Sequence, residues 1–422
     1  MRKRSFVTTL LLLCVVLTNT TTIATANSPK PGAKCSKAGA SQTSNGKKFT
    51  CVKSGTKLIW NKGVATSKAQ PAASKPTPKP TDSGPIKVVN STIAEANLGC
   101  NFANETAFTL KGPVICKSNI WTLVPKDQDS VESRAYRYVL ERWNKQPDGN
   151  LTVTFYIDPS AGDWTTEIEA GLRAGARFWG TSAPGSRPIP AFISDNHTFI
   201  EDAIVKAGLV QSEDSKTRNR LAQSGQAGWH GGYQDPNSYW DFLFRNLRAR
   251  SDVGYFQVGP HEYTHYAQSQ LAKGFAWDRS HMPWISEGIA SYFGSALGPM
   301  SKMPHNQMDN WRGSLKFVTK PLSFFTKPDQ EVYQSPQWGD VYPMGAFGAQ
   351  ALVALFGVEG IINYYLELAT GIGNEAAYKK SFKLGGMALT ELVEGYVSSV
   401  RKNDSWSLQT LEEKYKEAVA KG

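Results

Sequence analysis

The sequence predicts an α+β fold in which a small mixed sheet and a helical lobe follow small disulfide-closed β-modules. Three observations predict this organisation. Two cysteine pairs of equal spacing lie near the N-terminus, short alternating apolar stretches then indicate a few strands, and helical periodicity dominates from Pro260 onward. The chain has 422 residues, of which 40% are hydrophobic and 20% charged, so it can bury at least one large core.

The first 26 residues have the pattern of a secretory signal. A basic segment, Arg2-Lys3-Arg4, precedes an apolar stretch at residues 7–17 and a small-residue cleavage site at Ala24-Thr25-Ala26. The apolar stretch is short for a transmembrane helix, and no later segment is expected to span a membrane. We therefore expect the mature protein to be secreted or associated with the cell surface.

Four cysteines remain after removal of the signal. Cys35 and Cys51 are 16 positions apart, as are Cys100 and Cys116, and an Ile-Trp step follows each pair. The spacing predicts two copies, the second diverged, of a small disulfide-closed β-module. The alternative is two unrelated cysteine pairs. The first copy resembles short modules appended to secreted bacterial proteins.

Composition divides the chain further. The segment between the two copies is rich in Pro, Ala and Lys and has no aromatic residue, which predicts an extended, disordered linker. The predicted parts are a signal peptide at 1–26, a β-module at 27–66, a linker at 67–85, a second module at 86–126 and a large domain at 127–422.

The large domain begins with alternating helices and strands. Residues 131–143 place apolar side chains on one helical face, and residues 151–157 alternate as a strand. Residues 165–178 predict a helix with Ala and Gly packing positions, and residues 189–193 a second short strand. The glycine-rich residues 227–233 predict a turn into an edge strand facing a cleft.

A His-Glu-x-x-His motif occupies the start of a predicted helix after Gly259-Pro260. Residues four apart lie on one face of a helix, so His261 and His265 can both bind one Zn²⁺. Glu262 can then hold and deprotonate the metal-bound water. The alternative for this short motif is an amphipathic helix with two polar histidines.

A second motif supplies a third ligand. Glu287 lies 22 positions after His265 on another predicted helix, within the sequence Trp-Ile-Ser-Glu-Gly-Ile-Ala. In this arrangement the chain resembles gluzincins, the zinc peptidases that include thermolysin-like and aminopeptidase N-like enzymes. Trp284, Gly288 and Ala290 match the aminopeptidase-like pattern around its glutamate ligand. The resemblance implies a zincin-like catalytic domain at 127–422 with Glu287 as the third zinc ligand.

A third motif opens the apolar run at residues 341–357. Aminopeptidase N-like enzymes have a Tyr-x-x-Gly-Ala helix start at a comparable place, and Tyr342 falls on its tyrosine. The resemblance implies that the Tyr342 hydroxyl stabilises the oxyanion of the tetrahedral intermediate. The alternative is an ordinary aromatic residue at the start of a core helix.

One departure from the family bears on specificity. Aminopeptidases have a Gly-x-Met-Glu-Asn motif whose glutamate binds the free amine of the substrate, but residues 228–232 read Gly-Trp-His-Gly-Gly. Because this segment has no carboxylate, we expect cleavage inside peptides. His230 is expected either to contact substrate or, as is more common for a lone histidine, to lie on the surface.

The charge suggests a further contact. Of the formal net charge of +11, three positive charges belong to the predicted signal, and the remainder favours an anionic surface such as a cell wall. No nucleic-acid-binding motif accompanies the charge.

The predicted function is that of a secreted zinc peptidase acting on peptides or proteins. The alternative is a wall-binding or adhesion protein with a structural or degenerate zinc site. The sequence does not predict an oligomeric state.

Overall fold

The computed structural model of the chain divides into two compact units, Met1–Pro85 and Ile86–Gly422. The structure describes residues 30–44, 47–65, 106–147, 153–159, 165–180, 189–194, 196–208, 227–230, 241–244, 252–277, 281–301, 307–327 and 330–422. The predicted signal peptide, the predicted linker and Cys100 lie outside these residues.

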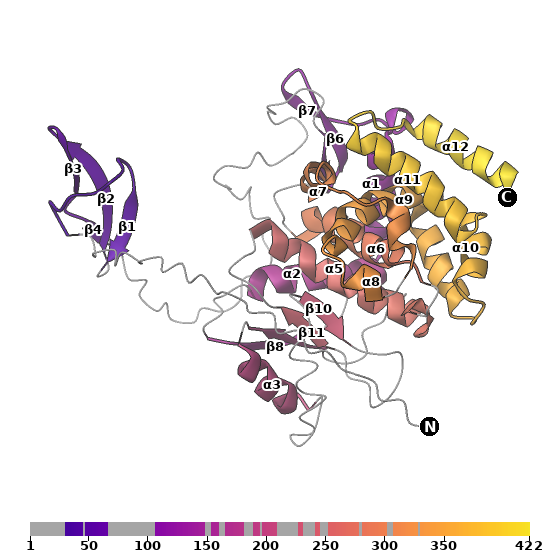
Figure 1. Ribbon diagram of the computed structural model, residues 1–422, viewed down its shortest axis with the longest axis horizontal. Helices are drawn as coiled ribbons and strands as arrows, with labels where there is room; N and C mark the ends of the chain where they lie inside the picture. The colour runs from indigo at the N-terminus through magenta and orange to yellow at the C-terminus, as the bar shows by residue number, and fades with distance from the viewer. Residues whose placement is uncertain are drawn as a thin grey trace, which may run out of the picture. The chain divides into compact units, whose positions relative to one another are not determined.

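The first unit is a small antiparallel sheet. It comprises β1 (Ser41–Ser44), β2 (Lys47–Ser54), β3 (Lys57–Trp60) and β4 (Val64–Ala65), with β2 paired to the other three strands (Figure 1). The predicted disulfide between Cys35 and Cys51 is present. Among its described residues, the buried apolar ones are Phe49 and Cys51, so the disulfide supports a described core that is very small.

The second unit begins with a similar meander. It comprises β5 (Thr106–Thr109), β6 (Gly112–Lys117) and β7 (Ile120–Leu123). Cys116 is disulfide-bonded, and its partner lies outside the described residues. Cys116 is paired across the strands with Trp121, just as Cys51 is paired with Trp60. The shared strand order and the shared pair favour the prediction of two diverged copies.

This second meander packs on the helix that follows it. After a short 3₁₀ turn, η1 (Lys126–Gln128), α1 runs over Val131–Lys145 and is capped by Ser130. The ring of Tyr136 stacks on Phe108 with centroids 4.1 Å apart, and its hydroxyl donates to the backbone oxygen of Thr109 at 3.0 Å. The meander therefore shares the core of the large unit.

A four-stranded mixed sheet follows in the order β10-β11-β9-β8. Its strands are β8 (Val153–Ile157), β9 (Ile189–Ile193), β10 (Ala227–His230) and β11 (Asp241–Phe244). The first two strands and β11 run parallel, whereas β10 is antiparallel and forms an edge, as predicted for this glycine-rich segment. The helices α2 (Thr165–Trp179) and α3 (His197–Lys206) lie between these strands in the chain.

The alternation of side chains along β9 joins two cores. Ile189, Ala191 and Ile193 belong to the main hydrophobic core, whereas Phe192 packs with Ile200 and its neighbours on α3. A strand buried on both faces is typical of a sheet covered by helices on both sides.

Helices make up the rest of the chain, as predicted. The main ones are α5 (Asp252–Leu271), α6 (Pro283–Ala296), α7 (Gln307–Leu315), α9 (Val341–Leu368), α10 (Asn374–Phe382), α11 (Gly386–Arg401) and α12 (Leu408–Lys421). Short elements connect them: η4 (Phe275–Trp277), η5 (Gly298–Ser301), η6 (Leu322–Thr326), α8 (Gln330–Tyr333) and η7 (Trp338–Asp340). The α+β class is thus confirmed.

The start of α5 differs from the prediction of a helix beginning at Gly259-Pro260. The helix begins at Asp252, and Pro260 lies in its interior. A side chain at Gly259 would meet the backbone of Gly171 and Leu172, so α5 is pressed closely against α2 at this point. This packing keeps the segment helical through the proline, although Pro260 has no N–H to donate.

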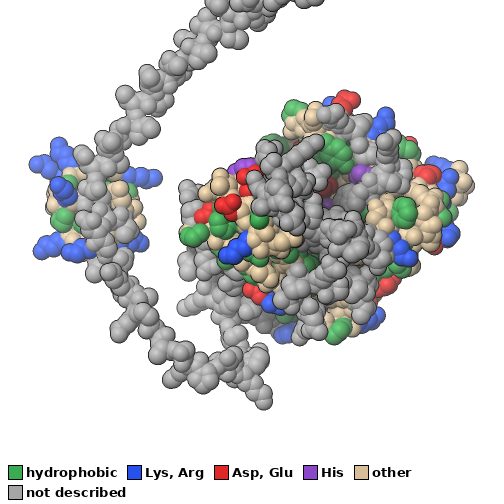
Figure 2. All heavy atoms as spheres, turned by 90° about the horizontal axis from the view of Figure 1, so that it is seen from below, with side chains coloured by type: hydrophobic (Ala, Val, Ile, Leu, Met, Phe, Trp, Pro, Cys, Tyr) green, Lys and Arg blue, Asp and Glu red, His purple; other side chains and the backbone are tan. Residues whose placement is uncertain are grey.

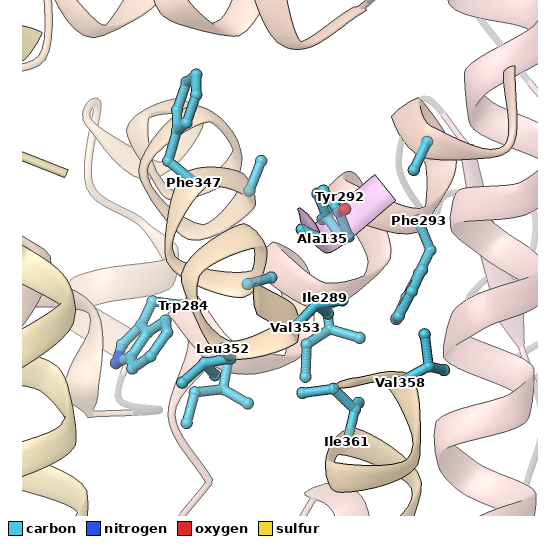
Figure 3. Close-up of a cluster of buried hydrophobic side chains, with 14 of the residues drawn as sticks. Ala135, Trp284, Ile289, Tyr292, Phe293, Phe347, Leu352, Val353, Val358 and Ile361 are labelled. Atoms are coloured by element: carbon cyan, nitrogen blue, oxygen red, sulfur yellow. The ribbon is translucent and has the colours of Figure 1, made fainter. Parts of the chain in front are cut away.

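The centre of the core is the contact between α6 and α9. Trp284, Ile289 and Phe293 on α6 lie among apolar side chains from α9 and its neighbours (Figure 3). After a break at Gly357, where φ is +68°, α9 continues to Leu368. The helical stretch Trp338–Leu368 is long and apolar enough to cross a membrane, but 72% of its apolar window is buried inside the protein, as in a core helix.

Two glycines allow the closest approach between these helices. A Cβ on Gly288 would lie 2.3 Å from the backbone oxygen of Gly345, and a Cβ on Gly345 would lie 2.7 Å from the Cα of Gly288. The two helices therefore touch through their backbones. On the other side of α6, a Cβ on Gly294 would lie 2.9 Å from the backbone oxygen of Gln257 on α5. Small residues thus set the position of α6 on both neighbours.

We predict that Gly288→Ala destabilises the fold by about 1–3 kcal/mol, because the new methyl group has to displace backbone atoms of α9. The matched control is Gly313→Ala on α7, where a Cβ would have no atom within 4 Å. This second change should stabilise slightly, by up to about 1 kcal/mol. Urea denaturation with a chelator present measures both. Equal free energies of unfolding for the two variants would contradict the backbone contact.

Candidate metal centre

Three side chains from two helices converge at the junction of α5 and α6. The Nε2 atoms of His261 and His265 are 3.2 Å apart. The Oε2 atom of Glu287 lies 3.5 Å from the Nε2 of His261 and 3.3 Å from that of His265. The structure therefore brings together the three metal ligands that the sequence predicts.

These distances fit a tetrahedral metal ion. Bonds of about 2.0–2.1 Å to nitrogen and oxygen ligands, at tetrahedral angles, place neighbouring ligand atoms about 3.3 Å apart. The three observed edges fall around this value, so the ligand atoms form one face of a tetrahedron. Among the described residues, no fourth histidine, cysteine or carboxylate joins the group. Three protein ligands with a free fourth position are typical of catalytic zinc sites.

The charges of the ligands are strongly coupled. Burial alone would lower the pKa of His265, but the negative charge of Glu287 and the hydrogen bond that its carboxylate accepts from His265 outweigh burial and raise this pKa to about 9. For Glu287, burial opposes ionisation, and the two imidazoles more than offset it, so the pKa of its carboxyl lies well below the ordinary value. A metal ion bound by these residues would replace the shared proton as the cation beside Glu287.

A hydrogen bond behind the site orients one ligand. The Nδ1 atom of His265 lies 2.9 Å from Oε1 of Gln268, and the Nε2 of Gln268 donates to the backbone oxygen of Ser286 at 2.9 Å. Once the proton shared with Glu287 is lost to a metal ion, the remaining proton on Nδ1 would leave the lone pair of His265 Nε2 directed at the other ligands. Gln268 thus links α5 to α6 one residue before Glu287.

Glu262 has the surroundings expected of a base. Its side chain is 5% exposed and lies on α5 between the two histidine ligands in sequence, without belonging to the ligand group. Its negative charge contributes to the raised pKa of His265. Among the described residues, no group donates a hydrogen bond to its carboxylate.

Tyr342 lies beside the ligands. It is in the first turn of α9, is half-buried, and has its ring centroid 6.0 Å from that of His261. The ring of Trp338 is 6.2 Å from Tyr342 and 4.9 Å from Tyr333, so three aromatic side chains form a row that starts at the metal ligands.

Tyr333, at the end of this row, forms a pair with a histidine that the sequence motifs did not predict. The hydroxyl of Tyr333 lies 3.1 Å from Nε2 of the buried His281, just before α6. Burial and the charge of Glu287 raise the pKa of Tyr333 to about 12, so its hydroxyl remains protonated at neutral pH. The two residues are 52 positions apart in different elements, and no local pattern connects them.

The glycine-rich segment is described only in part. Gly228 and His230 belong to β10, which pairs with β11 and packs near α5. The side chains of β10 and residues 231–232 lie outside the described residues, and so does the predicted contact of His230. Among the described strands, β10 is paired on one side alone.

No protein-family model matches the chain, and no curated protein or solved structure matches it either. The evidence for the centre is therefore the geometry of its residues together with the three sequence motifs.

We predict that the purified protein binds one divalent metal ion per chain and that His265→Ala loses it, because two remaining ligands bind weakly. The control is His197→Ala on α3, which should retain the metal. Elemental analysis after dialysis against a weak chelator gives the stoichiometry. A full equivalent of metal in His265→Ala would contradict the assignment.

Gln268 provides a finer test. Gln268→Leu keeps the three ligands but removes the acceptor for Nδ1 of His265, so metal affinity should fall about 10–100-fold. Gln268→Glu restores an acceptor and should bind the metal more tightly than Gln268→Leu does. Competition with a chromogenic chelator measures these affinities, and an unchanged affinity in Gln268→Leu would show that the hydrogen bond does not matter.

Proposed function

We propose that the protein is a secreted or cell-surface zinc peptidase of the gluzincin type that cleaves peptides internally. The observation that supports it best is the tetrahedral face formed by His261, His265 and Glu287, with the buried carboxylate of Glu262 on the same helix. A structural zinc site needs no base, and its four positions are normally all filled by protein ligands. When bound, zinc would polarise the scissile carbonyl and lower the pKa of a coordinated water toward neutrality.

Glu262 would act as the general base and then as the general acid. Its carboxylate accepts a proton from the attacking water and passes it to the nitrogen of the leaving amine. Burial removes competing solvent from this carboxylate, and its position next to His261 keeps it close to the ligand face. The proposed base therefore comes from the same helix turn as the first ligand.

Two tyrosines are candidates for stabilising the oxyanion. Tyr342 is adjacent to His261, and Tyr333 is electrostatically coupled to Glu287 and hydrogen-bonded to His281. A protonated phenol directed at the developing negative charge lowers the barrier. The ring contact with His261 and the family pattern favour Tyr342.

The edge strand suggests how a peptide would lie. β10 is the edge of the sheet among the described strands and packs near α5, which bears both histidine ligands. A substrate in extended form could add to this edge through backbone hydrogen bonds, which would place its middle at the metal ligands. This arrangement requires no free terminus of the substrate.

We predict that the zinc-loaded protein hydrolyses peptides blocked at both ends and that Glu262→Gln reduces the rate by at least about a hundredfold. Glutamine has nearly the same shape but cannot accept the proton. The assay is a library of internally quenched peptides, acetylated at the N-terminus and amidated at the C-terminus, and metal content is measured in the same samples.

The outcomes of this assay separate the alternatives. If metal is bound but neither protein cleaves any peptide, the site is structural, and the wall-binding or adhesion function replaces the proposed one. If free N-termini are required and single residues are released, the protein is an exopeptidase whose amine-binding carboxylate lies elsewhere.

The tyrosines can be compared directly. Tyr342→Phe should lower kcat about tenfold to a thousandfold with little change in KM, because the lost hydroxyl acts mainly in the transition state. Tyr333→Phe should have the smaller effect. Steady-state kinetics on one peptide substrate measures both. The reverse order would assign the oxyanion to Tyr333 and His281.

A further inference from the structure

The positive charge of the chain is concentrated in its small first unit. Residues 30–65 contain eight lysines and no Asp, Glu, Arg or His. Together with the three positive charges at residues 2–4, they account for the whole formal net charge of +11. The remaining residues therefore carry no net charge when taken together, and the second unit, residues 86–422, has 33 basic and 35 acidic side chains, a net charge of −2.

All eight lysines are exposed. They are Lys30, Lys34, Lys37, Lys47, Lys48, Lys53, Lys57 and Lys62. None of them forms an ion pair among the described residues, and the described part of the first unit contains no carboxylate side chain that could provide one. Eight unneutralised charges on so small a unit repel one another. Binding of a soluble polyanion or an anionic matrix would relieve this repulsion, so such binding is favourable.

The lysines are distributed over both faces of the sheet. Along β2, Lys47 and Lys53 are in register with the buried Phe49, whereas Lys48 has the opposite orientation because side chains alternate along a strand. Figure 2 shows lysine side chains projecting from opposite sides of this unit, with no acidic side chain among the described residues there. The charge therefore surrounds the unit.

The second meander shows that the scaffold does not require this charge. It has the same three-strand order and the same Cys-Trp pair, yet residues 106–123 contain two lysines, Lys111 and Lys117, whereas the corresponding strands of the first unit, residues 41–60, contain four. A meander that forms with two lysines has no structural need of four, and the first unit carries four more outside its meander. The difference between the copies points to a ligand of the first one.

We propose that the module of residues 30–65 is a binding module for a flexible polyanion, such as a phosphate-bearing polymer of a cell envelope. A flexible chain can follow charges on several faces, whereas a planar membrane can meet those on one face at a time. Val52 is the single large apolar side chain that is exposed in the described part of the module, so insertion into a bilayer has little support.

The choice of lysine also distinguishes between polyanions. The module has no arginine to bind a phosphate or a guanine with two parallel hydrogen bonds. Its aromatic side chains, Phe49 and Trp60, are buried and half-buried, so they are poorly placed to stack on bases. The module therefore offers compact ammonium charges without arginines or exposed aromatic rings. Such charges are suited to sequence-independent attraction to closely spaced phosphates. This binding does not depend on the proposed peptidase function.

The test compares two variants with the same loss of charge. In the module variant, Lys47, Lys48, Lys53 and Lys57 become Gln. In the control variant, the exposed Lys316, Lys402, Lys416 and Lys421 of the second unit become Gln. Binding of the purified whole protein to long-chain polyphosphate is measured as a function of NaCl concentration. Near-ultraviolet circular dichroism and the intact Cys35–Cys51 disulfide show that each variant is folded.

We expect the module variant to bind polyphosphate at least about a hundredfold more weakly, and the slope of log K against log salt to fall by about three. The control variant should stay within about threefold of the wild type. Equal losses in the two variants would overturn the proposal, because the whole-chain charge would then be responsible.

Two further binding measurements identify the class of partner. They use vesicles containing phosphatidylglycerol and duplex DNA, each at the same charge concentration as the polyphosphate. Tighter binding to either of them than to polyphosphate would also overturn the proposal. Glu262→Gln and the chelator-treated protein should bind polyphosphate as the wild type does. Failure of peptide cleavage therefore leaves this result unaffected, and a failure of binding says nothing about cleavage.

Discussion

The backbone contact between α6 and α9 is the constraint on which the candidate metal centre depends. Gly288 follows Glu287 directly, and a side chain there would overlap the backbone of Gly345. The contact fixes the position of α6 along α9. As a result, the Glu287 side chain is directed toward α5. Tyr342, three residues before Gly345 on α9, then lies near the metal ligands. Trp284 supports this arrangement from within the core, where its Nε1 donates to Thr390 at 3.1 Å. The Trp-x-x-Glu-Gly pattern is therefore a packing motif as much as a ligand motif.

Electrostatics and packing act in opposite directions at this centre. Two imidazoles and a carboxylate are held within 3.5 Å of one another in a largely buried place, which costs free energy when the charges are not matched. The coupling of His265 to Glu287 reduces that cost by keeping a proton between them. A site that is costly to assemble is held together by the rigid helices around it, and Gln268 adds a further link between α5 and α6. The proposed cation would fit a set of ligands that the fold has already oriented.

The sequence predicts most of what depends on local periodicity and little of what depends on contacts between distant elements. The four-residue spacing of His261 and His265 fixes both on one helical face, so their proximity follows directly from the helix. Glu287 could be placed through its resemblance to a family pattern. The helix start at Pro260 was wrong because packing between α5 and α2 overrides a local signal. The pairing of His281 with Tyr333 depends on two elements joined only in the fold, and no spacing rule relates them.

The two β-meanders share a strand order and a cross-strand Cys-Trp pair but differ in their surroundings and surface. In the second, apolar contacts such as that between Phe108 and Tyr136 attach the meander to the core of the large unit. In the first, the exposed positions carry lysine, and the apolar core is confined to a few residues beside a disulfide. A small unit that gains so little from hydrophobic burial depends on its disulfide for stability, and its surface is then free to vary in charge. The slightly negative net charge of the large unit, −2 over residues 86–422, follows the same division. A proposed peptide-binding site gains nothing from general attraction to anions, whereas a polyanion-binding module requires it.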